Sequence, residues 1–248
     1  MTINNAQIKQ KARQTLEGHW FEHCSFSVLL IVLELLCAGI LNLFPDNGSL
    51  AAAVVILVAA SILQALLGLF VTGASFHFLK CLRGEPSPLG DIVLPFKKQP
   101  DRYLIVELIE IAAGLLCYLP MMAAAYFMRS PALRLLLLLL FLIGGTAVYM
   151  VVKAAFVFSR FYLLEDNKLG AIASLKKSAA AMKGKKRSYV KLLLSFIGYL
   201  LLSLCTAGLG LIWVIPYFLT SQAEFYIDSA ESTLASDSGT GSETFVSK

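Results

Sequence analysis

The sequence is short of charged residues. Lys, Arg, Asp and Glu make up 15% of its 248 residues, whereas hydrophobic residues make up 58%. Soluble domains usually carry about a quarter charged residues, so this balance excludes an ordinary soluble protein and favours a chain folded in a lipid bilayer. The formal net charge of +5 does not indicate nucleic acid by itself, because basic cytoplasmic loops are expected in a membrane protein.

Recognisable catalytic and metal-binding motifs are also missing. The sequence contains neither H-E-x-x-H nor G-x-S-x-G, and its five cysteines show no C-x-x-C spacing. The three histidines are scattered, and His77 is expected to form an interhelical hydrogen bond rather than to bind a ligand. We therefore expect no metal, no cofactor and no enzymatic activity, and an intramembrane enzyme is the weakest alternative.

Long apolar runs take the place of these motifs. A helix of about 20 apolar residues crosses the hydrocarbon core of a bilayer, and six runs predict six spans in an all-α polytopic bundle: residues 25–44, 50–79, 103–127, 132–163, 189–205 and 208–225. Residues 192–219 could instead form one helix, but the two glycines of 206–210 favour a break. Pro216 predicts a kink in the last span, and the polar composition of 231–248 predicts a disordered cytoplasmic tail.

Two further segments, 6–23 and 165–184, have the pattern of amphipathic helices lying on the cytoplasmic surface of the membrane. In the first, apolar residues recur every four positions at Ile8, Ala12, Leu16 and Trp20. In the second, one face carries Ile172, Leu175, Ala179 and Met182. We expect both helices to lie on the inner leaflet, with the cations of the second reaching lipid headgroups.

The distribution of Lys and Arg predicts the orientation of the spans. With six spans, 18 of the 21 basic residues fall on one side, Arg129 and Arg134 on the other, and Lys153 within a span. Because basic residues gather in cytoplasmic loops, we expect both termini in the cytoplasm.

A basic segment joins the second amphipathic helix to the fifth span. It consists of Lys176, Lys177, Lys183, Lys185, Lys186, Arg187 and Lys191. It does not match a phosphate-binding loop, and it has too few aromatic residues for a nucleic-acid site. We expect it to contact anionic headgroups of the inner leaflet, each cation contributing about 1 kcal/mol. Besides lipid, the further partner that we expect is another membrane protein or a second copy of the chain.

Four ionisable residues lie away from the ends of the predicted spans, all in the inner half of the bilayer: Glu34, Glu107, Glu110 and Lys153. Such residues are costly in a bilayer and usually have partners, so we expect Lys153 to pair with Glu110 or Glu34. A helix-packing ion pair is the favoured interpretation. An ion pathway, and with it a transporter or channel component, is the alternative.

Several stretches resemble a known family. They are "IKQKARQTLEGHW" (8–20), "GASFHFLKCLRGE" (73–85) and the region 174–226, which contains S-x-x-x-M-K-G from Ser178 and T-x-G-x-G-x-x-W-x-x-P-Y from Thr206. Together they resemble the bacterial integral-membrane family catalogued as domain of unknown function 975, although Tyr199 stands where members often have Trp. The resemblance implies a bacterial polytopic membrane protein, and it supplies no activity or catalytic residues.

Overall fold

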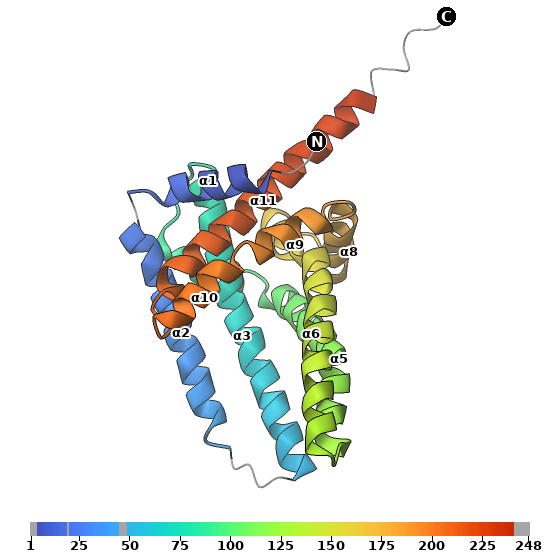
Figure 1. Cartoon of the computed structure of the whole chain (residues 1–248). Coiled ribbons are helices and arrows are strands. Elements are labelled where there is room, and N and C mark those ends of the chain that lie inside the picture. The colour runs from blue at the N-terminus through green and yellow to red at the C-terminus, as the bar shows by residue number, and fades with distance from the viewer. Residues whose placement is uncertain (1–3, 19, 45–48, 241–248) are drawn as a thin grey trace, which may run out of the picture. The chain divides into compact units, whose positions relative to one another are not determined.

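The computed structural model describes residues 4–18, 20–44 and 49–240, without the side chains of Leu89, Tyr126 and 232–240. Within these residues every regular element is helical, which confirms the predicted all-α class. The elements are α1 (Asn5–Leu16), α2 (Trp20–Leu41), α3 (Leu50–Leu82), the short 3₁₀ helix η1 (Leu89–Val93), α4 (Leu94–Lys97), α5 (Pro100–Phe127), α6 (Pro131–Phe156), α7 (Ser159–Glu165), α8 (Ala171–Ala181), α9 (Lys186–Leu194), α10 (Ile197–Cys205) and α11 (Leu211–Thr240) (Figure 1).

The chain divides into two compact units. The first takes in the described residues of Met1–Ile40, Phe70–Lys98 and Arg187–Lys248, and the second those of Leu41–Leu69 and Gln99–Lys186. The first unit contains α1, nearly all of α2, the second part of α3, and α9 to α11. The second unit contains α5 to α8, and each unit is described separately below.

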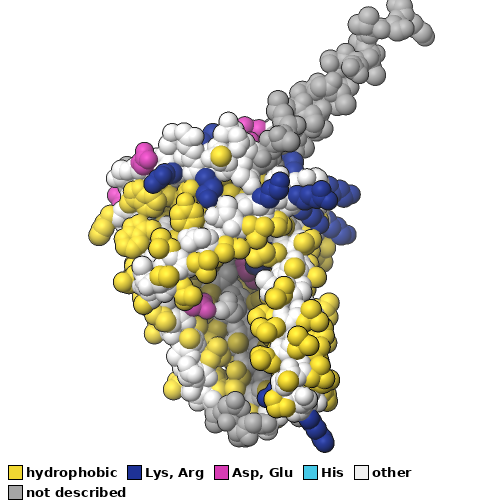
Figure 2. Space-filling view, in the orientation of Figure 1, with side chains coloured by type: hydrophobic (Ala, Val, Ile, Leu, Met, Phe, Trp, Pro, Cys, Tyr) yellow, Lys and Arg dark blue, Asp and Glu magenta, His cyan; other side chains and the backbone are white. Residues whose placement is uncertain are grey.

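Five helical segments among the described residues are long and apolar enough to cross a membrane: Trp20–Leu41, Leu50–Leu82, Pro100–Ala125, Pro131–Glu165 and Lys186–Cys205. They match the first five predicted spans. Their apolar side chains are widely exposed, as on α6, where Leu136 is 62% and Ile143 71% exposed, and yellow hydrophobic side chains cover much of the surface in Figure 2. Such a surface is stable in lipid rather than in water, so the chain is a membrane protein.

The sixth predicted span, 208–225, is not among these five segments. It falls in α11, where polar residues such as Gln222 and Glu224 interrupt the apolar run. Six spans therefore remain a prediction.

The predicted break before α11 is confirmed. α10 ends at Cys205 and α11 begins at Leu211. Gly208 has a φ of +89°, which an L side chain rarely adopts. The ring centroids of Phe196 and Tyr217 lie 5.1 Å apart, so the two sides of the turn pack as an antiparallel pair. Pro216 lies inside α11, and the kink stays a prediction.

The two amphipathic segments do form helices, but their apolar faces do not lie free on a membrane. In α1, Ile8, Ala12 and Leu16 are at most 3% exposed, because α1 packs on α11 (Figure 1). Leu175 of α8 and Met182, which directly follows α8, are buried as well, whereas Ile172 is 60% exposed. These apolar faces therefore pack largely against protein, and the placement of the two helices on the inner leaflet stays a prediction. The same periodicity serves packing against protein.

The predicted disordered tail, 231–248, overlaps the end of α11. α11 continues through residues 231–240, where the sequence predicted disorder, so that part of the prediction is corrected. The remainder of the predicted tail, 241–248, lies outside the described residues.

Candidate functional site

A buried ionic cluster lies in the second unit. Lys153 Nζ is 2.6 Å from Glu110 Oε2, and Arg160 Nη2 is 3.6 Å from both Glu107 Oε1 and Glu110 Oε2. Glu107 and Glu110 are 7% and 2% exposed. The predicted pairing of Lys153 with Glu110 is confirmed.

The sequence positions these groups on facing helix surfaces. Glu107 and Glu110 are three residues apart on α5 and share one face. Lys153 on α6 and Arg160 on α7 are seven residues apart, about two helical turns. Gly68 of α3 leaves the space that the Glu107 carboxyl group occupies, since a Cβ at that position would overlap it. Close packing of helices therefore builds the cluster.

The cluster is balanced in charge, with two carboxylates facing two cations. Each buried carboxylate has a cation within 4 Å, which offsets much of the desolvation of both charges. Sequence reasoning missed Arg160, because its position near the end of the fourth predicted span made it look like a loop cation. Its spacing of seven residues from Lys153 was the signal that could have identified it.

Glu34, the other predicted intramembrane residue, lies on α2 in the first unit with an exposed side chain. The cluster as described therefore contains three of the four predicted residues together with Arg160. Of the two partners that the sequence left open for Lys153, Glu110 is the one whose contact is described.

The basic segment is divided between the two units. In the second unit Lys176, Lys177 and Lys183 are exposed, while Lys185 and Lys186 are half-buried. Arg187 and Lys191 belong to the first unit and are exposed. Figure 2 shows Lys and Arg side chains gathered over the region of α8. Lys177 Nζ also lies 4.4 Å from the centroid of the Tyr162 ring, a cation–π distance.

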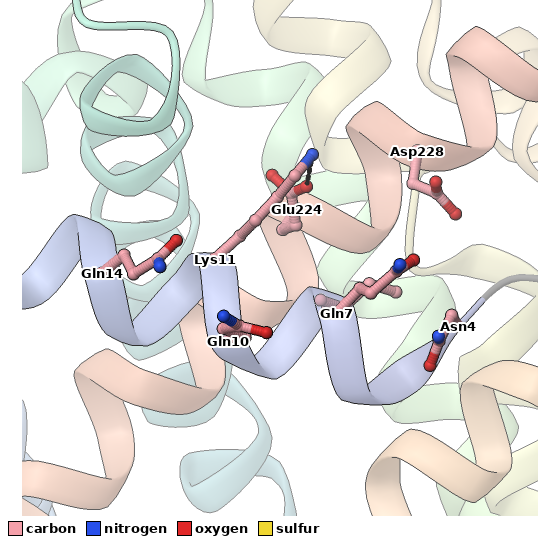
Figure 3. A pocket seen from close by; sticks show the side chains of 8 residues that line it. Asn4, Gln7, Gln10, Lys11, Gln14, Glu224 and Asp228 are labelled. Carbon is pink, nitrogen blue, oxygen red and sulfur yellow. Dashed lines mark ion pairs between the residues drawn. The ribbon is translucent and has the colours of Figure 1, made fainter.

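A polar pocket of about 330 Å³ lies between α1 and α11 in the first unit, where Lys11 Nζ is 2.7 Å from Glu224 Oε1. In Figure 3 Lys11 reaches across to Glu224, and the amides of Gln7, Gln10 and Gln14 lie along the same helix as Lys11. The hydrogen bond and the charge of Glu224 raise the pKa of Lys11 above its usual value. The pair links α1 to α11 in addition to the buried apolar contacts between them.

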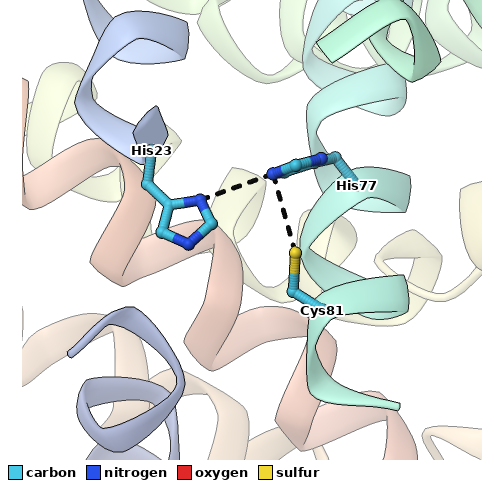
Figure 4. Close-up of side chains that lie close together, drawn as sticks. All are labelled: His23, His77 and Cys81. Carbon is cyan, nitrogen blue, oxygen red and sulfur yellow. Dashed lines mark hydrogen bonds between the residues drawn. The ribbon is translucent and has the colours of Figure 1, made fainter. Parts of the chain in front are cut away.

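The histidines are not as scattered as the sequence suggested. His23 at the start of α2 and His77 near the end of α3 are buried side by side, with His77 Nε2 3.4 Å from His23 Nδ1 and 3.6 Å from Cys81 Sγ. Figure 4 shows the two imidazoles and the thiol pointing toward one another. The scattering of the histidines was the reason to expect no metal site, and that reason is wrong for His23 and His77. His19 lies outside the described residues. The spacing of His77 and Cys81, one helical turn apart, was the available signal.

Comparison with known proteins identifies a family but no activity. The chain belongs to the family described as "Protein of unknown function (DUF975)", whose family model matches residues 1–231. No curated protein and no solved structure matches the chain. The family assignment made from the sequence motifs is thereby confirmed.

Proposed function

We propose that this member of the DUF975 family is a non-enzymatic protein of the bacterial cell membrane that binds anionic lipid headgroups through its basic segment. Both termini would lie in the cytoplasm, so that the basic segment faces the inner leaflet. The observation that carries this proposal is that one face of α8 is buried against the protein while the opposite face is exposed.

One face of α8 is fixed to the protein. Ser178 Oγ donates a hydrogen bond to Ala155 O at 2.8 Å and accepts one from Phe158 N at 3.1 Å. Leu175 is 6% exposed on the same face. These contacts with the α6–α7 junction fix which way α8 faces.

The opposite face of α8 carries the cations. Lys176 and Lys177 are exposed there, and Lys183 follows in the next turn of chain, also exposed. A surface of this kind attracts anionic lipid with about 1 kcal/mol per cation, and salt screens the attraction. Because the buried face fixes the orientation of α8, its exposed lysines would face the phosphate groups of the lipid.

The alternative function is a transporter or channel component, and the ionic cluster of the second unit gives it little support. Its carboxylates are each paired with a cation, which favours a role in packing α5, α6 and α7. Exposed apolar flanks on α2 and α6 would face lipid or, in an assembly, a membrane-protein partner or a second copy.

The lipid proposal can be tested with the full chain purified in a neutral detergent. The protein is exposed to mixed phosphatidylcholine and phosphatidylglycerol, and the retained phosphatidylglycerol is counted by native mass spectrometry. Replacing Lys176 and Lys183 by Gln should weaken retention about tenfold or more, and raised salt should act in the same direction.

A matched control replaces two exposed cations elsewhere, Arg129 and Arg134, by Gln. These lie at the other end of the predicted spans, so phosphatidylglycerol retention should change little. Equal losses in the two double variants, or no loss in either, would contradict the proposal.

A further inference from the structure

The buried polar group that the proposed function leaves unused is the cluster of His23, His77 and Cys81. Its three potential ligand atoms, His23 Nδ1, His77 Nε2 and Cys81 Sγ, all lie within 4.8 Å of one another. We propose that these residues bind one d¹⁰ transition-metal ion, Zn²⁺ or Cu⁺, through two imidazole nitrogens and a thiolate.

Two of the three ligand separations already fit such an ion. Zn–N bonds of about 2.0–2.1 Å and Zn–S bonds of about 2.3 Å, at tetrahedral angles, separate two nitrogens by about 3.4 Å and a nitrogen from a sulfur by about 3.6 Å. The observed separations are 3.4 Å between the His23 and His77 nitrogens and 3.6 Å from His77 to Cys81. Only the distance between His23 and Cys81 has to shorten, and rotation about the Cys81 side chain can supply that.

A hydrogen-bonded relay sets the tautomer of His77. Ser87 Oγ donates to Asp91 Oδ2 at 3.1 Å and lies 2.8 Å from His77 Nδ1. A serine hydroxyl has one hydrogen, and since Asp91 receives it, Ser87 must accept from His77 Nδ1–H. The lone pair of His77 therefore sits on Nε2 and faces His23 and Cys81. Metal-binding histidines are oriented in this way by a second shell.

The relay is itself held in place. Lys80 Nζ lies 2.9 Å from the same Asp91 oxygen. The segment that carries Asp91 approaches α3 so closely at Gly73 that a Cβ there would overlap the carbonyl group of Ile92. Gly73 therefore permits the approach of backbone that brings Ser87 and Asp91 to His77.

Aromatic side chains surround the imidazoles. The ring of Phe26 lies 4.3 Å from that of His77, and the ring of Phe78 lies 5.4 Å from that of His23. His23 and His77 are 5% and 4% exposed. An apolar surrounding of this kind limits access of water to a bound ion.

The close contacts among His23, His77 and Cys81 cannot all be strong hydrogen bonds at the same time. Both His23 Nδ1 and Cys81 Sγ approach the single lone pair of His77 Nε2, which accepts one strong hydrogen bond at a time. A metal ion instead accepts a lone pair from each of the three atoms. On binding, the Cys81 thiol loses its proton to solvent, so that the thiolate and the ion form the bond.

The ligand types select the class of ion. Thiolate and imidazole favour Zn²⁺ and Cu⁺ over Mg²⁺ and Ca²⁺, which prefer oxygen ligands. With Cu⁺ and one thiolate the site is neutral, whereas with Zn²⁺ it carries one positive charge close to the Asp91 relay. The three residues leave one position of a tetrahedral zinc site for a further ligand.

The test measures metal bound to the full chain purified in detergent. The protein is incubated with Zn²⁺, or with Cu⁺ under reducing conditions, freed of unbound ion, and analysed for metal by mass spectrometry. We expect about one ion per chain with at least one of the two metals, and a loss of about tenfold or more in retained ion for Cys81→Ser and for His77→Gln.

Cys24→Ser is the matched control, because Cys24 neighbours His23 but is not one of the three ligands. It should retain metal like the unmodified chain. Retention of neither metal above the level of a protein-free sample would overturn the proposal, as would equal retention in Cys81→Ser and Cys24→Ser.

A second measurement needs no variant and so does not depend on whether a substituted protein folds. A thiol-alkylating reagent is added with and without the metal, and modification of each cysteine is followed by peptide mass spectrometry. Bound metal should slow alkylation of Cys81 about tenfold or more while leaving Cys24 unchanged. Equal rates at Cys81 with and without either metal would overturn the site.

Discussion

The two polar clusters of this protein differ in how their charges and lone pairs are satisfied. In the second unit, Glu107 and Glu110 meet Lys153 and Arg160, so that anions and cations of the same chain face one another. In the first unit, two imidazole nitrogens and a thiol converge, and each can donate a lone pair to a metal ion once the hydrogens between them are displaced. The ionic cluster of the second unit is balanced in charge by groups of the chain itself, whereas the cluster of His23, His77 and Cys81 gains most from an ion taken from outside.

The difference separates a structural polar cluster from a binding site. Burial and perturbed surroundings occur in both, and they mark functional sites only with a certain probability. Complementarity is the sharper criterion. Opposite charges in contact indicate a role in helix packing. Several atoms that converge and can each donate a lone pair indicate a site for a metal ion.

The largest effect is expected from breaking the charge balance of the second unit. Lys153→Met removes the cation nearest to Glu110, whose carboxylate is 2% exposed, and should lower the free energy of unfolding by about 3 kcal/mol. Denaturant unfolding in detergent, followed by circular dichroism, measures it. The double variant Lys153→Met with Glu110→Gln should recover most of the loss, and a single variant as stable as the unmodified chain would refute the structural role.

A somewhat smaller effect is expected at Gly73 in the first unit. Gly73→Ala forces the added methyl group against the Ile92 carbonyl, and such overpacking costs about 1–3 kcal/mol. It should also displace Asp91 from the relay and so weaken metal binding. Gly39→Ala is the control, because a Cβ at Gly39 meets nothing within 4 Å. Equal unfolding free energies for the two variants would contradict the close approach.

Ser87→Ala tests the relay with less disturbance of packing. It removes the hydroxyl that accepts from His77 Nδ1, and loss of a second-shell partner typically weakens metal binding about tenfold or more. Metal titration monitored by protection of Cys81 measures the change. Ser87→Thr, which keeps the hydroxyl, should restore the affinity, and equal affinities for Ala and Thr would argue against a relay.

The smallest effect is expected for the ion pair between Lys11 of α1 and Glu224 of α11. Lys11→Met should cost about 1 kcal/mol, because the Glu224 side chain is 5% exposed and loses its cation, whereas the Lys11 side chain is 62% exposed and solvent screens the pair. The pKa of Lys11 is raised from 10.5, so its contribution is complete below that pH and disappears as the pH rises through the raised value. Unfolding measured at neutral and strongly alkaline pH should show the difference between the two proteins shrinking, and a difference that grows would contradict the sign.

Much of the fold could be predicted from the sequence. Long apolar runs fixed five candidate spans, because the length of a span follows from the thickness of a bilayer, and the glycines of 206–210 indicated the turn between α10 and α11. The environment of α1 and α8 could not be predicted. A stripe such as Ile8, Ala12 and Leu16 has the same period whether it packs on lipid or on another helix.

The sites were predictable to a smaller extent. The need of Lys153 for a partner followed from the cost of an isolated charge in a bilayer, and it identified Glu110. The approach of His23 to His77 did not follow from the sequence, because 53 residues separate them and their contact depends on how α2 packs against the end of α3. Arg160 was misassigned for a similar reason, since α7 turns its side chain toward α5.

The metal-dependent shift in melting temperature tests the distinction between the two clusters most directly. Unmodified protein, Cys81→Ser and Lys153→Met are each melted in detergent with and without the ion that the chain retains. A ligand that binds only the folded state at 100 times its dissociation constant adds about 2.7 kcal/mol of stability. The account predicts a clear rise for the unmodified chain and for Lys153→Met, and none for Cys81→Ser. A rise of the same size in Cys81→Ser, or none in the unmodified chain, would contradict it.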